Sequence, residues 1–255
     1  MRLGFIGTGT ITRAVVTGLM HVGAPFESIY LSPRNTEVAT GLAALDSRVS
    51  VCRTNQHVLD SSDVVCLAVV PQIAADVCKE LRFTARHHVI SFLAGVAISD
   101  LKQMVGPVGA IVRAIPLPAV AAAKGSTAIC PPDEIASRLF SYVGAAVEVG
   151  DENKFDALSA VTATMASFYA VLETQAAWLV EQGIDYRSAR AYLAAYCEGL
   201  SHEATKGAEP FSALVQSSMT AGGINEQLHH ELSGNGTYSH YSAALGNVLK
   251  RIKRR

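Results

Sequence analysis

Short apolar runs alternate with helix-like spacing of apolar residues over the first 150 positions of the chain. Eight runs have the length and composition of strands: 3–6, 29–31, 49–51, 64–69, 89–92, 110–113, 126–129 and 146–149. The run Val64–Val69 is apolar at every position, as expected of a parallel strand that is covered on both faces. Strand and helix patterns alternating at this pace predict an α/β fold with a doubly wound, mostly parallel sheet.

The pattern changes near Gly150, after which helical spacing dominates. The segment Phe155–Gln182 contains no Pro or Gly, and its apolar residues cover more than one helical face, which indicates packing against other helices. Four further helices are expected over 186–207, 210–219, 227–232 and 238–255. We therefore expect an α/β domain over residues 1–150 and an all-α dimerisation domain over residues 151–255. The long apolar helix favours a homodimer or a higher homo-oligomer.

Composition and charge narrow the class of partner. The chain has 255 residues and a net charge of -1, which favours neither nucleic acid nor a membrane surface as a partner. Its five cysteines are scattered, show no metal-binding spacing and suit reduced thiols in a reducing compartment. The sequence shows neither a secretory signal nor an uninterrupted apolar run of about 20 residues. We expect a cytoplasmic protein that acts on a small molecule without a metal.

A glycine loop follows the first predicted strand and opens the first helix. Gly7 allows a tight turn, and Gly9 leaves room for a pyrophosphate close to the backbone. The N–H groups of Thr10 and Ile11 then lie at a helix N-terminus, which attracts phosphate. Thr12 replaces the third glycine of the usual pattern and is expected to loosen the turn without abolishing binding. The loop predicts an N-terminal Rossmann domain; the alternative is a purely structural glycine turn.

The end of the second strand indicates which dinucleotide binds. An Asp or Glu there would bond the ribose hydroxyl groups of NAD, but the chain has Ser32-Pro33-Arg34-Asn35. The Arg34 guanidinium can bind a 2′-phosphate, and Ser32 and Asn35 can add hydrogen bonds. These residues favour NADP(H). The alternative is an ordinary turn with a solvated arginine.

Several motifs, in this order and spacing, resemble those of the pyrroline-5-carboxylate reductase family. Besides the Gly7-x-Gly9 loop and the Ser32–Asn35 segment, they comprise Asn55, Ala68-Val69-Val70-Pro71-Gln72, Ser91-Phe92-Leu93-Ala94-Gly95, Val112-Arg113-Ala114-Ile115-Pro116 and Thr220-Ala221-Gly222-Gly223-Ile224-Asn225-Glu226-Gln227. The resemblance extends over nearly the whole chain. It implies an NADPH-dependent oxidoreductase of proline biosynthesis. The implied substrate is a cyclic imine that bears a carboxylate, and the enzyme reduces its C=N bond.

The resemblance also assigns cofactor residues beyond the glycine loop. It implies that Asn55, Val69 and Pro71 line NADP(H), near its adenosine end and its nicotinamide side, and that Ala94 lies close to the nicotinamide. Interlocked helices between two subunits are a further implication.

The same resemblance places the substrate at the segment that begins at Thr220. Gly222, Gly223 and Ile224 would begin a helix whose free N–H groups hold the substrate carboxylate. Asn225 is the candidate donor to the imine nitrogen, and Thr220 is the second candidate catalytic residue. The alternative is a flexible turn between two helices.

The chain departs from the family pattern mainly on the substrate side. Val70 stands in place of a lysine, Leu117 in place of an asparagine, and Ile224 and Asn225 in place of two threonines. We therefore expect a diverged imine reductase whose substrate differs from pyrroline-5-carboxylate. The alternatives are a reductase or dehydrogenase acting on another imine or carbonyl compound, and a non-catalytic NADP-binding dimer.

Overall fold

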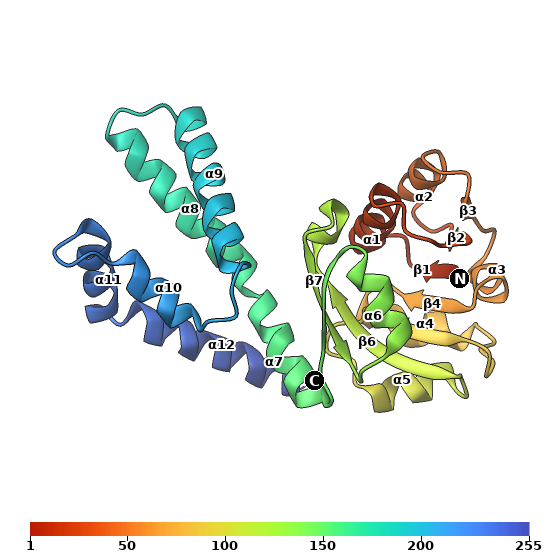
Figure 1. The fold of residues 1–255 in the computed structure, drawn as a ribbon. Coiled ribbons are helices and arrows are strands. Elements are labelled where there is room, and N and C mark those ends of the chain that lie inside the picture. Colours follow the sequence, from red (N-terminus) through yellow and green to blue (C-terminus); the bar gives the residue numbers. More distant parts are fainter. Residues whose placement is uncertain (255) are drawn as a thin grey trace. The chain divides into compact units, whose positions relative to one another are not determined.

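A single sheet organises the N-terminal part of the chain (Figure 1). The computed structural model describes residues 1–254, and within them eight strands pair in the order β3-β2-β1-β4-β5-β6-β7-β8. Each predicted strand is present: β1 (Arg2–Ile6), β2 (Ser28–Leu31), β3 (Val49–Val51), β4 (Val64–Leu67), β5 (His88–Ser91), β6 (Ala110–Pro116), β7 (Gly125–Cys130) and β8 (Gly144–Glu148). Neighbouring strands are parallel except β6 and β7. The mostly parallel sheet is confirmed.

Helices connect the strands: α1 (Thr10–His21), α2 (Thr36–Ala43), α3 (Asn55–Ser61), α4 (Pro71–Lys79), α5 (Ile98–Val105) and α6 (Glu134–Ser141). A short 3-10 helix, η1 (Pro118–Ala122), lies between β6 and β7. The β4 residues show how the sheet is covered. Val64 and Cys66 pack into one core with residues of α1, α2 and α6, while Val65 and Leu67 pack into another with residues of α3, α4 and α5. Both faces are buried, which explains the unbroken apolar run.

The chain separates into two compact units, one formed by Met1–Ser159 with the last residues from Arg251 on, and the other by Ala160–Lys250. The proposed domain boundary at residue 150 stays a prediction. Helix α7 (Glu152–Thr162) begins in the first unit, where its Phe155 side chain is buried.

The second unit is helical. It contains α8 (Thr164–Glu181), α9 (Tyr186–Ala204), α10 (Phe211–Ser218), α11 (Ile224–Gly234) and most of α12 (Thr237–Lys253). The long helix expected over 155–182 is divided into α7 and α8 at Ala163. Gly183 ends α8 as expected: its φ is +90°, and the following Ile184 N–H donates to the Leu179 carbonyl. Ala176, Ala189 and Leu193 form a small core between α8 and α9.

Within residues 1–254, one helical stretch, Glu152–Glu181, is long and apolar enough to cross a membrane by length and composition, and an 18-residue window inside it has a mean hydropathy of 1.4. This stretch is not an uninterrupted apolar run, because polar residues such as Glu173 occur within it. A helix whose apolar surface is covered by another subunit meets the same criterion.

Candidate cofactor and substrate sites

The predicted cofactor segments lie next to one another at the carboxyl ends of the parallel strands. The first residue after β2, β4 and β5 in each case donates its backbone N–H to a carbonyl at the end of the neighbouring strand. The bonds are Ser32 to Phe5 at 3.0 Å, Ala68 to Ile6 at 2.8 Å, and Phe92 to Leu67 at 2.9 Å. The strand order reverses between β1 and β4, and ligands of doubly wound sheets bind in the crevice at this point. The β1–α1 loop therefore occupies the expected dinucleotide position.

The two glycines of the β1–α1 loop serve different purposes. Gly7 has a φ of +103°, and a Cβ there would lie 2.6 Å from the carbonyl carbon of Ala68. Any side chain would collide with the turn after β4. A Cβ on Gly9 would meet nothing within 4 Å, so the surface above Gly9 is open. Gly7 is thus required by the fold, whereas the missing side chain at Gly9 leaves room for a ligand.

The first turn of α1 suits an anion. Gly9 is the N-cap residue and offers no side-chain cap, and the first turn contains no acidic residue. The N–H groups of Thr10 and Ile11 therefore lie at a positive helix end without a competing carboxylate. This fits the pyrophosphate of a dinucleotide.

Thr12 strengthens this loop. Its side chain is fully buried, and its Oγ1 donates to the Gly7 carbonyl at 2.6 Å. The expectation that Thr12 loosens the turn is wrong, because the hydroxyl supplies a bond that a third glycine could not make.

Ser32 also holds the loop from within. Its Oγ accepts the Gly7 N–H at 2.9 Å. The Thr8 hydroxyl donates to the Ser32 carbonyl at 2.7 Å and lies 2.9 Å from Ser32 Oγ, so the Ser32 hydroxyl hydrogen points to Thr8. Both hydroxyls are buried. Ser32 therefore supports the loop and does not itself make the bond to a cofactor phosphate that the sequence led us to expect. Its partner Thr8 was not predicted from the sequence.

Arg34 and Asn35 lie on the surface beyond β2. The Asn35 side chain accepts the Val38 N–H at 3.3 Å and so caps α2, which leaves its amide N–H groups available. Arg34 is exposed, and within residues 1–254 its guanidinium has no hydrogen-bond or ion-pair partner. A guanidinium that no carboxylate neutralises fits the 2′-phosphate of NADP(H).

The remaining cofactor candidates occupy the next three strand ends. Asn55 is half-buried at the start of α3, where Thr54 caps the helix by accepting the His57 N–H at 3.1 Å. Val69 precedes α4, Pro71 is the first residue of α4, and Ala94 is exposed in the loop between β5 and α5. All three lie beyond the β4 and β5 carboxyl ends, where the resemblance puts the nicotinamide side.

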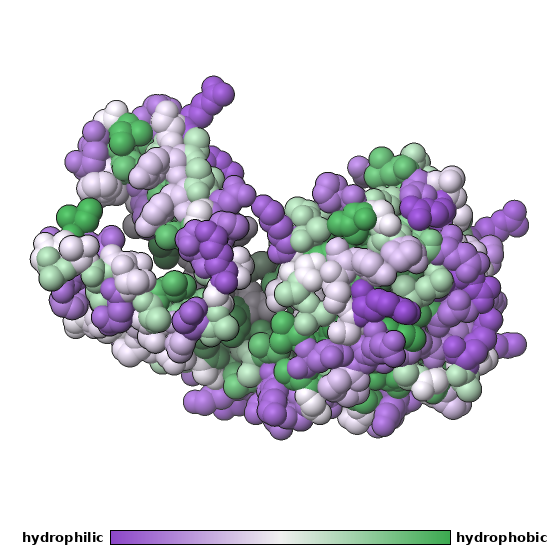
Figure 2. Space-filling view, in the orientation of Figure 1, coloured by the Kyte–Doolittle hydropathy of each residue, from purple (hydrophilic) through white to green (hydrophobic). Residues whose placement is uncertain are grey.

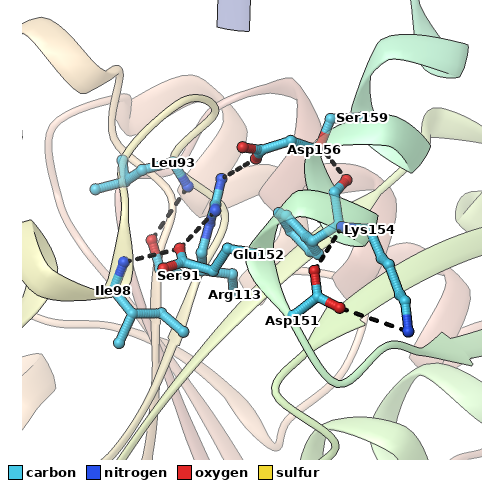
Figure 3. A network of polar contacts seen from close by, with 10 residues as sticks. Ser91, Leu93, Ile98, Arg113, Asp151, Glu152, Lys154, Asp156 and Ser159 are labelled. Atoms are coloured by element: carbon cyan, nitrogen blue, oxygen red, sulfur yellow. Dashed lines mark hydrogen bonds and ion pairs between the residues drawn. The ribbon is translucent and has the colours of Figure 1, made fainter. Parts of the chain in front are cut away.

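A buried arginine on β6 binds two carboxylates at the start of α7 (Figure 3). Arg113 on β6 is 3% exposed, and its Nη1 lies 2.7 Å from Oε1 of Glu152. The Arg113 Nη2 lies 3.2 Å from Asp156, and the guanidinium lies 4.3 Å from the centre of the Phe155 ring. Arg113 belongs to the Val112–Pro116 motif, but no local pattern in the sequence predicts its carboxylate partners.

The glycine pair of the predicted substrate segment belongs to the helical unit. Gly222 has a φ of +73°, which favours glycine. A Cβ on Gly223 would lie 2.9 Å from the Thr220 carbonyl oxygen, which accepts the Gly223 N–H at 2.8 Å. Both glycines are therefore needed for the tight turn before α11.

The N–H groups of the two glycines in this turn are already used. The Gly222 N–H donates to Oε2 of Glu226 at 2.7 Å, and the Gly223 N–H donates to Thr220. The Asn225 side-chain amide donates to the Ser218 carbonyl at 2.9 Å. The expectation of free N–H groups on the two glycines is wrong, because the turn and the Glu226 side chain already use them. Asn225 keeps one amide N–H and its carbonyl oxygen.

Comparison with known proteins agrees with this arrangement. Residues 2–95 match a family described as NADP oxidoreductase coenzyme F420-dependent, and residues 152–255 match one described as pyrroline-5-carboxylate reductase dimerisation. A pyrroline-5-carboxylate reductase of Synechocystis is 33% identical over 182 residues, which are 68% of this chain and 67% of that protein. One of Haemophilus influenzae is 28% identical over 231 residues, which are 87% of this chain and 84% of that protein.

A solved structure shows the same fold. The pyrroline-5-carboxylate reductase of Coxiella burnetii superposes with a TM-score of 0.86 at 23% sequence identity. The superposition covers 99% of this chain and 97% of that one. Both the α/β fold and the helical region are therefore shared.

Proposed function

The chain belongs to the pyrroline-5-carboxylate reductase family, and on this premise we propose that it reduces the C=N bond of a small cyclic imine with NADPH. It is an NADP-dependent oxidoreductase. One arrangement carries the proposal. At the point where the strand order of the sheet reverses, the backbone at Gly9 is open to a ligand, and Arg34, just beyond the neighbouring strand β2, has no partner among residues 1–254.

The α/β unit supplies the cofactor site in this proposal. Gly9 and the N–H groups of Thr10 and Ile11 hold the pyrophosphate, and Arg34 with Asn35 binds the 2′-phosphate. NADPH, when bound, supplies a hydride.

Asn55 contacts the adenosine side of the cofactor in this proposal. Val69, Pro71 and Ala94 give the nicotinamide side an apolar surface. An apolar surface excludes water from the reacting carbon, which strengthens the electrostatic interactions there.

The substrate contacts come from the turn before α11. The free N–H of Asn225 donates to the nitrogen of the C=N bond, and the exposed Thr220 hydroxyl is a second donor. Gly222, Gly223 and Ile224 shape this surface. Glu226 occupies the Gly222 N–H, and the backbone N–H groups of Ile224 and Asn225 at the start of α11 hold the substrate carboxylate that the sequence resemblance implies.

The helical unit supports a homo-oligomer, and the state we propose is a dimer in the cytoplasm. Residues 152–255 match a dimerisation family. Large apolar side chains such as Phe168 and Trp178 are exposed on α8 within one subunit. Apolar side chains are visible on the surface of the helical unit in Figure 2. Covering them with a second subunit removes this surface from water.

NADPH oxidation with a panel of cyclic imines tests the proposal. We expect turnover of at least one imine and none of 2-oxo acids. Gly9→Val should lower kcat/KM by at least about tenfold because the added side chain fills the approach to the backbone. Gly41→Val is the matched control, since a Cβ on Gly41 also meets open space. NADPH binding without oxidation by any imine or carbonyl compound would overturn the proposed reaction.

A further inference from the structure

We infer that Thr8 is a positioning residue that sets the preference for NADPH over NADH, because its hydroxyl fixes the Ser32 carbonyl from which the chain leads to Arg34. The inference rests on the proposed function, since it concerns how the proposed 2′-phosphate contact is placed. It is carried by the hydrogen bonds between the β1–α1 loop and the end of β2.

Two side-chain hydrogen bonds take the place of one backbone hydrogen bond where β1 and β2 end. The pairing of Phe5 with Leu31 and the bond from the Ser32 N–H to the Phe5 carbonyl set the parallel register. A continued parallel ladder would next join the Gly7 N–H to the Ser32 carbonyl. Instead, the Gly7 N–H donates to Ser32 Oγ at 2.9 Å, and the Thr8 hydroxyl donates to the Ser32 carbonyl at 2.7 Å. The position of that carbonyl therefore depends on Thr8.

The Thr8 hydroxyl is used within the protein. Thr8 and Ser32 are both buried, and Thr8 Oγ1 accepts the Ser32 hydroxyl at 2.9 Å while it donates to the Ser32 carbonyl. Both hydroxyl hydrogens are thereby satisfied. A buried bond of this kind is not replaced by water when one partner is removed. Thr8 consequently acts on the cofactor through Ser32 and not by contact.

The chain between Ser32 and Arg34 transmits this position with little freedom. The Ser32–Pro33 peptide is planar, and the Pro33 ring fixes its own φ at about −65°. Only the Pro33 ψ then remains between the Ser32 carbonyl and the backbone nitrogen of Arg34. On the other side, Asn35 caps α2, and the Thr36 hydroxyl donates to the Pro33 carbonyl at 3.3 Å. A guanidinium that binds a phosphate through two parallel N–H groups needs such a fixed starting point.

Fluorescence titrations with NADPH and NADH test the inference. Thr8→Val keeps the shape of the side chain but removes the hydroxyl. It should raise the Kd of NADPH at least about fivefold and the Kd of NADH less than about twofold, which lowers the preference. Thr8→Ala should shift the preference in the same direction, and Thr8→Ser, which retains the hydroxyl, should keep that of the parent protein.

Ser62→Ala is the matched control. It removes another buried bond from a hydroxyl to a carbonyl, the 2.7 Å bond from Ser62 to Val58 at the end of α3. This variant should leave the ratio of the two Kd values unchanged. Loss of stability alone would therefore be separated from loss of the preference.

The double variant Thr8→Val/Arg34→Ala tests whether Thr8 acts through Arg34. In the Arg34→Ala background, Thr8→Val should not change the ratio of the two Kd values, because the group that Thr8 positions is absent. A Thr8→Val protein that keeps the parent ratio, or that shifts the ratio equally in both backgrounds, would overturn the inference while leaving the proposed reaction intact. An Arg34→Ala protein with the parent ratio would remove the proposed 2′-phosphate contact and the inference with it. A lack of NADPH oxidation with every imine would overturn the proposed reaction alone, because the titrations do not depend on turnover.

Discussion

Oε1 of Glu152 lies 2.7 Å from Nη1 of Arg113, and the same oxygen accepts the Ile98 N–H at 3.0 Å. One carboxylate thereby joins β6, the start of α5 and the start of α7. Because the segment between Ala94 and Ile98 leads from the predicted nicotinamide contact into α5, the pair also limits the movement of that segment. The contact connects the stability of the α/β unit to the shape of its cofactor surface.

Glu152→Ala should lower the free energy of unfolding by about 1–3 kcal/mol, since it removes a charged partner from a buried guanidinium and leaves the Ile98 N–H without an acceptor. Asp156 keeps part of the charge compensation, so the loss should stay below that of a fully unpaired buried charge. Urea unfolding measures the change. Lys154→Ala, which breaks the exposed Lys154–Asp151 pair, should cost less than about 0.5 kcal/mol. Equal effects of the two variants would contradict a special role of Glu152.

The Thr12 hydroxyl should contribute to both stability and cofactor affinity. Thr12→Val keeps the shape of the side chain but leaves the half-buried Gly7 carbonyl without its 2.6 Å donor, so stability should fall by about 1–2 kcal/mol. A less ordered loop should also weaken NADPH binding severalfold, as measured by fluorescence titration. Thr40→Val removes a comparable 2.7 Å bond on the exposed side of α2 and is the control. Unchanged NADPH affinity in Thr12→Val would show that the loop is held by Ser32 alone.

Much of the fold could be predicted from the sequence because its signals are local. The unbroken apolar run in β4 indicates a strand buried on both faces, and Gly183 indicates the end of α8. The positions of the cofactor segments follow from the rule that parallel strands end at one edge. These features depend on residues that are close in sequence.

The contacts within the sites could not be predicted in the same way. Ser32 reaches Gly7 across 25 positions, and only the pairing of β1 with β2 brings them together. Glu226 was overlooked because α11 was expected to begin at Gln227, whereas it begins at Ile224. That shift puts Glu226 into the first helical turn, from which its side chain reaches Gly222. An acidic residue three positions after a Gly-Gly pair is the signal that would have identified it.

Arg34 should determine the preference for NADPH. A charge-assisted hydrogen bond contributes about 1.5–3 kcal/mol, so Arg34→Ala should weaken NADPH binding about ten- to a hundredfold. NADH lacks the 2′-phosphate, and its Kd should not change. Arg138→Ala removes a surface arginine of α6 and should affect neither cofactor. The comparison requires fluorescence titration at one fixed salt concentration, because exposed charges are screened by ions. Equal affinities for NADPH and NADH in the parent protein would remove the basis of this assignment.

The apolar surface of α8 should hold the subunits together. Phe168 is 49% exposed and Trp178 58% exposed in the isolated chain, and burying one such side chain contributes about 1.5–3 kcal/mol. Phe168→Glu replaces this gain with the cost of a buried charge, so the dissociation constant of the oligomer should rise at least about a hundredfold. Light scattering over a dilution series measures it. Leu45→Glu changes a side chain that is 69% exposed on the α/β unit and should leave the oligomer intact.

A parent protein that stays monomeric at micromolar concentration would contradict the proposed dimer. A Phe168→Glu protein that stays associated would instead place the interface on another surface. Because the family match at residues 152–255 covers the whole helical unit, Trp178→Glu is the next variant to separate one end of α8 from the other.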